Sequence, residues 1–135
     1  MKRNIISVVV GLLSAIVVFV IAETINSSLH PAPQTLDYND SIAVKAFYEN
    51  QPITLWILVL VGWIIGSVLC GFLIKLISRN DNKKLPIIAG IILTLSAIIN
   101  FFSLPHPTWF IIVGLIIFIP STLLGHKFYT LQTNG

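Results

Sequence analysis

Long apolar segments alternate with short polar segments along the whole chain. The apolar segments cover about residues 4–24, 53–77, 86–103 and 109–125. Each holds about 17 to 25 residues, and a helix of about 20 apolar residues crosses the hydrocarbon core of a bilayer. The pattern predicts an all-α fold, in which four transmembrane helices pack as one bundle and form a single integral membrane domain over residues 1–135.

The polar segments predict the connections. Residues 26–51 form an outer loop rich in Pro, Asn, Asp and Ser, and residues 78–85 form a short loop after the second span. Within the outer loop, Asp40 is a suitable N-cap for a short amphipathic helix, which we expect to lie flat at the membrane interface. The stretch Leu104–Thr108 is long enough only for a tight turn between the last two spans.

The first apolar segment also has features of a signal peptide. A basic start precedes it, and Val20-Ile21-Ala22 is similar to a cleavage site. Its apolar stretch of about 18 residues, however, exceeds the 7–15 of a signal sequence. It also carries a row of small residues four positions apart, which favours a retained helix that packs against others: Ser7, Gly11 and Ala15.

Composition and charge support a membrane location. The chain is 56% hydrophobic and 10% charged, whereas soluble domains contain about 25% charged residues. Of the eight Lys and Arg, all but Lys45 fall on the side of the two termini and the 78–85 loop; of the five acids, all but Asp81 fall on the other side. By the positive-inside rule, both termini are expected in the cytoplasm of a bacterium, and the protein in its cytoplasmic (inner) membrane. The lipid bilayer explains the basic residues, so nucleic acid is not an expected partner.

Small residues of the second span predict close helix contacts. Gly62, Gly66 and Cys70 fall four positions apart, and Gly71 lies on a neighbouring row. Such rows let helix backbones approach, either within one chain or between copies. Trp56 and Trp109 begin the second and fourth spans and are expected to be interface anchors.

Candidate chemistry gathers at the predicted outer face. Glu23, His30, Asn100 and His106 all fall near that level. A carboxylate facing an imidazole could pass a proton, sense pH or hold a divalent metal, and an ionisable group at membrane depth is a functional hypothesis by default. Structural alternatives stay open: Glu23 could reach interfacial water, Asn100 could bond another helix, and His106 could be a turn residue. Whether a metal binds here stays unknown.

No enzyme pattern is present. The chain has no Gly-rich phosphate loop, Gly-x-Ser-x-Gly, His-Glu-x-x-His or Cys pair. The single cysteine can form no disulfide within the chain. We therefore lean against an enzyme and expect no cofactor.

Two resemblances bear on function. The size, the four spans and Glu23 in "AET" are similar to small multidrug resistance transporters, which use a glutamate in the first helix. Here Glu23 is expected at the end of the span, and a long loop follows, so that mechanism is not carried over. The chain more closely resembles a group of small uncharacterised bacterial four-span membrane proteins, a likeness that implies the fold but no activity. It rests on Glu23, His30-Pro31, Leu36-Asp37, Asp40, Gly62, Gly66 and Pro105–Trp109.

Three functions are compatible with this pattern. The first is an accessory or scaffold protein that packs through its Gly-rich second span against partner membrane proteins or its own copies. The alternative is a proton- or cation-linked small transporter or channel that uses the outer Glu/His cluster as a homo-oligomer. The third is a membrane enzyme with an outer His/Glu site.

Overall fold

The computed structural model describes residues 1–135 and contains helices but no strands. The helices are α1 (Lys2–Leu29), α2 (Ser41–Glu49), α3 (Ile53–Ser78), α4 (Lys84–Ser103) and α5 (Thr108–Asn134). All except α2 are long and apolar enough to cross a membrane. The predicted all-α fold, with four long apolar helices and one short helix between the first two, is therefore confirmed. Length and composition are what indicate a multi-pass membrane protein.

Two helices extend beyond the apolar segments that predicted them. α1 continues to Leu29, into the residues expected to begin the outer loop, and α5 continues to Asn134, beyond the fourth apolar segment. Polar side chains in the added turn of α1 bond to their own helix: the Thr24 hydroxyl donates to the Val20 carbonyl (2.8 Å) and the Ser28 hydroxyl to the Thr24 carbonyl (2.9 Å). The polar residues at this point of the sequence therefore do not end α1. As a consequence, Glu23 lies inside α1 and not at its last turn.

The short helix α2 begins at the predicted cap. The Asp40 carboxylate accepts hydrogen bonds from the backbone N–H groups of Ile42 (3.0 Å) and Ala43 (3.2 Å). These bonds satisfy two of the N–H groups that a helix start leaves free. Val44 is the buried residue of α2, so the helix turns one face toward the bundle.

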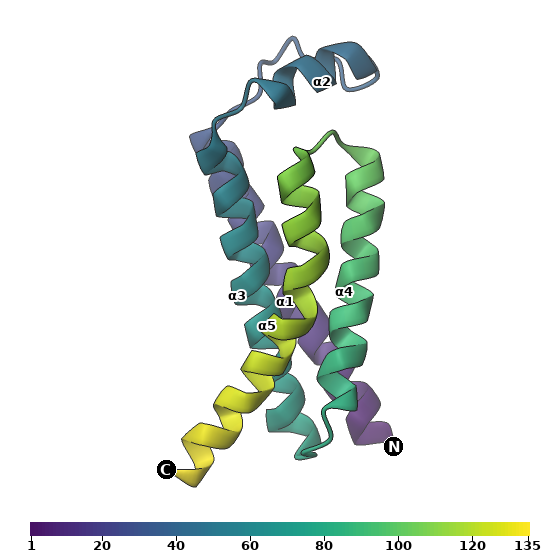
Figure 1. Ribbon diagram of the computed structural model, residues 1–135, viewed down its shortest axis with the longest axis vertical. Coiled ribbons are helices and arrows are strands. Elements are labelled where there is room, and N and C mark those ends of the chain that lie inside the picture. Colours follow the sequence, from purple (N-terminus) through teal and green to yellow (C-terminus); the bar gives the residue numbers. More distant parts are fainter.

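The long helices run side by side, and α2 lies across one end of them (Figure 1). We call this the α2 end; both termini and the α3–α4 loop lie at the opposite, termini end. α3 packs along α1 on one side and α5 on the other, α4 packs mainly on α5, and α1 makes little contact with α4. α1 crosses behind the bundle, from near α4 at the termini end toward α3 at the α2 end.

Small residues set the close approach of α1 to α3. A Cβ added at Gly62 would lie 2.4 Å from the Ala22 Cβ, and one added at Gly66 would lie 2.5 Å from the Phe19 ring. The thiol-bearing Cys70 is fully buried on the same side of α3. These residues of the second span, for which the sequence left open contacts within the chain or between copies, contact α1 of the same chain.

The contact between α3 and α5 is closer still. A Cβ at Gly71 would lie 1.8 Å from the Thr122 carbonyl oxygen, and a Cβ at Gly125 would lie 1.8 Å from the Val68 carbonyl oxygen. The two backbones therefore touch, and only glycine fits at either position. Pro120 lies inside α5, and the helix changes direction below its middle (Figure 1).

An aromatic cluster fills the centre of the bundle. Trp63 on α3 is 4% exposed, and its ring lies 5.2 Å from Phe110 and 5.3 Å from Phe118 of α5, measured between ring centroids. Phe101 of α4 and Phe19 of α1 pack on its other sides at 6.0 and 6.4 Å. One side chain thus contacts all three other long helices. The cluster closes the bundle beneath its α2 end.

Candidate binding site at the α2 end

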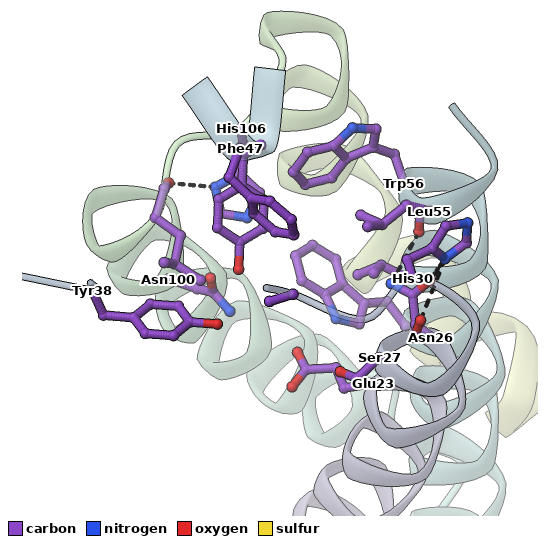
Figure 2. Close-up of a pocket in the computed structure, with 15 residues that line it drawn as sticks. Glu23, Asn26, Ser27, His30, Tyr38, Phe47, Leu55, Trp56, Asn100 and His106 are labelled. Atoms are coloured by element: carbon purple, nitrogen blue, oxygen red, sulfur yellow. Dashed lines mark hydrogen bonds between the residues drawn. The ribbon is translucent and has the colours of Figure 1, made fainter. Parts of the chain in front are cut away.

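A cavity of about 320 Å³ lies at the α2 end of the bundle. Its lining comes from α1, the segment between α1 and α2, α2, α3, the end of α4 and the α4–α5 turn. All four polar residues proposed from the sequence line this one cavity: Glu23, His30, Asn100 and His106. Figure 2 shows them on different sides of the space, with Glu23 on α1 and Asn100 and His106 across from it.

Glu23 is the only charged residue that lines the cavity. Its carboxylate points from α1 into the space (Figure 2). The two ion pairs of the protein, Lys45–Glu49 and Lys75–Asp81, do not involve it. The carboxylate therefore brings one uncompensated negative charge to an otherwise neutral lining.

His30, which the sequence suggested as a partner of Glu23, makes hydrogen-bond contacts with other residues instead. Its Nδ1 lies 3.0 Å from the Asn26 side-chain oxygen, and its Nε2 lies 3.4 Å from the Thr54 hydroxyl oxygen. Asn26 in turn donates through Nδ2 to the Leu55 carbonyl at 3.3 Å. These bonds join the end of α1 to the start of α3. Both ring nitrogens of His30 therefore contact residues of the helices that line the cavity.

His106 is held in an aromatic stack. Its Nδ1–H donates to the Leu104 carbonyl at 2.6 Å, which leaves Nε2 as the acceptor of a neutral ring. The ring stacks on Phe110, with centroids 5.3 Å apart and planes 15° apart, and its edge meets Phe101 and Trp56. Burial lowers the pKa of His106, and the bond to Leu104 opposes this only in part. The imidazole is therefore kept neutral beside the cavity.

Aromatic rings form much of the remaining wall. Trp56, which the sequence suggested as an interface anchor, is 5% exposed and packs against Tyr48 of α2 at 6.0 Å, whereas Trp109 is 39% exposed. Phe47 lies 5.2 Å from Tyr48 and also lines the cavity. Burial raises the pKa of Tyr48, and the nearby Tyr38 and Glu23 raise it further. Its hydroxyl therefore stays protonated and able to donate.

A second cavity of about 460 Å³ lies between α2 and the start of α5. It shares three side chains with the first cavity, which form a wall between them: Tyr48, Trp56 and His106. The ion pair of Lys45 and Glu49 borders the second cavity, with 3.8 Å between the charged atoms. The second cavity is therefore lined by a positive and a negative side chain, whereas the only charged residue that lines the first cavity is Glu23.

Sequence reasoning missed a polar cluster at the termini end. The Lys75 ammonium, on a side chain that is buried, bonds to the Asp81 carboxylate, and the buried His126 lies with Nε2 3.1 Å from the Asn80 carbonyl oxygen. The bond to Lys75 and its charge hold the pKa of Asp81 below its ordinary value. This cluster ties the α3–α4 loop to α3 and α5. The signal available in the sequence was Lys75 at an otherwise apolar helix end.

No group of three or more His, Cys, Asp or Glu side chains is placed to hold a metal ion. The lining can instead accept a positive charge at Glu23, stack on a flat or apolar body, and hydrogen-bond through amide and phenol groups. No protein-family model, no curated protein and no solved structure matches the chain. Function is therefore inferred from the geometry of this cavity.

Proposed function

We propose that this protein is a membrane binding protein that takes up a small organic cation in the cavity at its α2 end. The observation that carries this proposal is the lone Glu23 carboxylate, which points into a cavity with no cationic lining residue. An ionisable side chain on a helix long and apolar enough to cross a membrane is a functional hypothesis by default.

The aromatic wall favours an organic cation over a bare metal ion. Ammonium groups are attracted to the faces of Trp and Tyr rings by about 0.5–2 kcal/mol, and Trp56, Trp63, Tyr38 and Tyr48 all line the cavity. A bare metal ion, without its water ligands, needs several oxygen ligands from the protein, and no group of three or more His, Cys, Asp or Glu is placed to supply them. Neutral His106 adds an acceptor without repelling the ligand.

Binding suits the geometry better than conduction through one protomer. The aromatic cluster around Trp63 and the glycine contacts of α3 close the bundle beneath the cavity. A cation that enters would therefore rest at the α2 end. Transport by a homo-oligomer stays a prediction.

The scaffold role also stays a prediction, but the glycine contacts of α3 restrict which surface a partner protein could use. Gly62 and Gly66 are buried against α1, and Gly71 against α5. A partner protein would have to dock on another surface, because these positions are already occupied by the chain itself.

The charge asymmetry supports an orientation for this proposed role. The basic termini and the 78–85 loop would face the bacterial cytoplasm, and the α2 end, which carries most of the acids, would face outward. The cavity would then receive its ligand from outside the cell or from the outer leaflet of the inner membrane.

The test is calorimetric titration of the detergent-solubilised protein with benzyltrimethylammonium. A matched uncharged ligand, neopentylbenzene, measures the contribution of charge. We expect Glu23→Gln to weaken binding of the cation by at least about tenfold, or 1.4 kcal/mol. Glu49→Gln, which removes an acid at the same end outside this cavity, should leave the affinity unchanged. Equal affinity of Glu23→Gln and wild type, or equal binding of the uncharged ligand, would overturn the proposal.

A further inference from the structure

The depth of Glu23 in the membrane indicates where the charge of a ligand would sit. α1 rises about 1.5 Å per residue, so Glu23 lies about 30 Å along the helix from Arg3, the last basic residue at its start. The hydrocarbon core of a bilayer is about 30 Å thick. With Arg3 at one boundary of the hydrocarbon, the carboxylate therefore lies at the level of the lipid headgroups of the opposite leaflet.

The cavity is open at Glu23. The glutamate is an exposed residue and yet lines the cavity. Both α1 and α4 contribute lining residues, but these two helices make little contact with each other, and α1 moves away from α4 toward the α2 end (Figure 1). On the water side, α2 and the segment before it border the space, and Tyr38 and Phe47 are among its lining residues. Glu23 therefore offers an approach to the cavity from the side, at the height of the lipid headgroups.

An apolar stripe leads along α1 to the carboxylate. Val20 lies one helical turn before Glu23, and Ile16 lies one turn before that, so all three share a face. Val20 is 56% exposed and Ile16 is 51% exposed. The carboxylate thus stands at the top of an apolar surface that faces hydrocarbon. This is the complement of a molecule with a cationic head and a hydrocarbon chain.

We propose that the ligand is such an amphiphile, an amine or quaternary ammonium with a long hydrocarbon chain, which enters from the outer leaflet between α1 and α4. Its cationic head binds Glu23 and the aromatic wall inside the cavity. Its chain stays in the membrane along Val20 and Ile16. This inference rests on the proposed function and adds the lipid-like class of the ligand and its route of entry.

The experiment compares two cations with the same head in lipid nanodiscs: benzyltrimethylammonium and benzyldimethyldodecylammonium. Saturable binding is measured after subtraction of uptake by empty nanodiscs. We expect the dodecyl compound to bind at least about 100-fold more tightly by total concentration, because its chain concentrates it in the bilayer. Glu23→Gln should weaken the saturable binding of both compounds by at least about tenfold.

Two further variants test the route along α1. Val20→Asn places a polar group in the stripe, and Ile21→Asn places the same group at a neighbouring exposed position on another face of α1. We expect Val20→Asn to weaken binding of the dodecyl compound by at least about threefold and Ile21→Asn to leave it unchanged. Benzyltrimethylammonium should bind both variants as it binds wild type.

The outcomes separate the two proposals. Equal affinities for the two cations, both dependent on Glu23, would overturn the amphiphile inference and leave the binding function standing. Saturable binding of neither cation would remove both proposals. Binding of the dodecyl compound that is the same in wild type and Glu23→Gln, or the same in Val20→Asn and Ile21→Asn, would show ordinary lipid contact and overturn the inference.

Discussion

The substitution Gly71→Ala tests the closest contact in the bundle. The added methyl group would lie 1.8 Å from the Thr122 carbonyl oxygen, 2.7 Å from its carbonyl carbon and 3.0 Å from the His126 nitrogen. All three atoms belong to the backbone of α5, so no side-chain rotation can make room. The helices themselves have to separate.

The required separation sets the magnitude. Ordinary van der Waals contact begins near 3.4 Å, so α3 and α5 would move apart locally by about 1.5 Å. A gap of about 0.5–1 Å already removes a quarter to a half of the attraction between atoms in contact. Association of membrane helices depends on that packing, because lipid provides no hydrophobic driving force between them. Overpacking typically costs about 1–3 kcal/mol, and we expect Gly71→Ala to destabilise by about 3 kcal/mol.

The assay is reversible unfolding in mixed detergent micelles at increasing SDS, followed by tryptophan fluorescence. Val61→Ile is the matched control, because it adds one carbon atom to an exposed position of the same helix; its effect should be below about 0.5 kcal/mol. If Gly71→Ala unfolds at the same SDS concentration as Val61→Ile, the backbones of α3 and α5 are not in contact, and this account of the bundle is wrong.

Three further predictions concern hydrogen bonds and charges. Thr122→Val removes the hydroxyl that donates to the Pro86 carbonyl at 2.8 Å and should cost about 1 kcal/mol in the same unfolding assay; an unchanged midpoint would contradict it. The pKa of Asp81 is lowered by Lys75, so its contribution to stability is present above about pH 4, the ordinary carboxyl value, and lost as pH falls through the lowered value. Asp81→Asn should therefore lower stability at pH 7 and flatten the acid dependence; parallel curves for the two proteins would refute this. Burial lowers the pKa of His106, so below about pH 6.5 the unfolded chain takes up a proton that the folded protein resists, and stability falls. His106→Phe should lose part of the decrease between pH 7 and pH 5, measured as the shift in midpoint against wild type; an identical shift would mean that His106 does not contribute.

The four long apolar helices were predictable because each depends on a long continuous segment of apolar residues. The apolar segments are separated clearly enough to locate four helices, and the polar pattern placed Asp40 at the start of α2. The ends of α1 and α5 were not predictable in the same way. Beyond about residue 24 the sequence becomes polar, but Thr24 and Ser28 bond to carbonyl groups of their own helix, so a polar composition and a continuing helix are compatible.

The sequence was also enough to predict that the polar residues of the candidate site gather at one end of the bundle, but not which contacts they make. With consecutive helices running in opposite directions, polar residues at alternate ends necessarily gather at one level, which is why Glu23, Asn100 and His106 were expected together. Apolar helices that are hydrophobic on every side do not indicate which side faces a neighbour. The sequence therefore could not show that Trp56 points inward, nor that Trp63 is the centre of the aromatic cluster.

Glu23 differs from the buried polar residues, because its carboxylate has no ion-pair partner within the chain. No buried side-chain nitrogen or oxygen lacks a partner: His30 bonds to Asn26, and Lys75 to Asp81. Neither ion pair of the protein involves Glu23, and its carboxylate faces the cavity. The cation binding that we propose depends on this feature, a carboxylate that lines the cavity without an ion-pair partner in the chain.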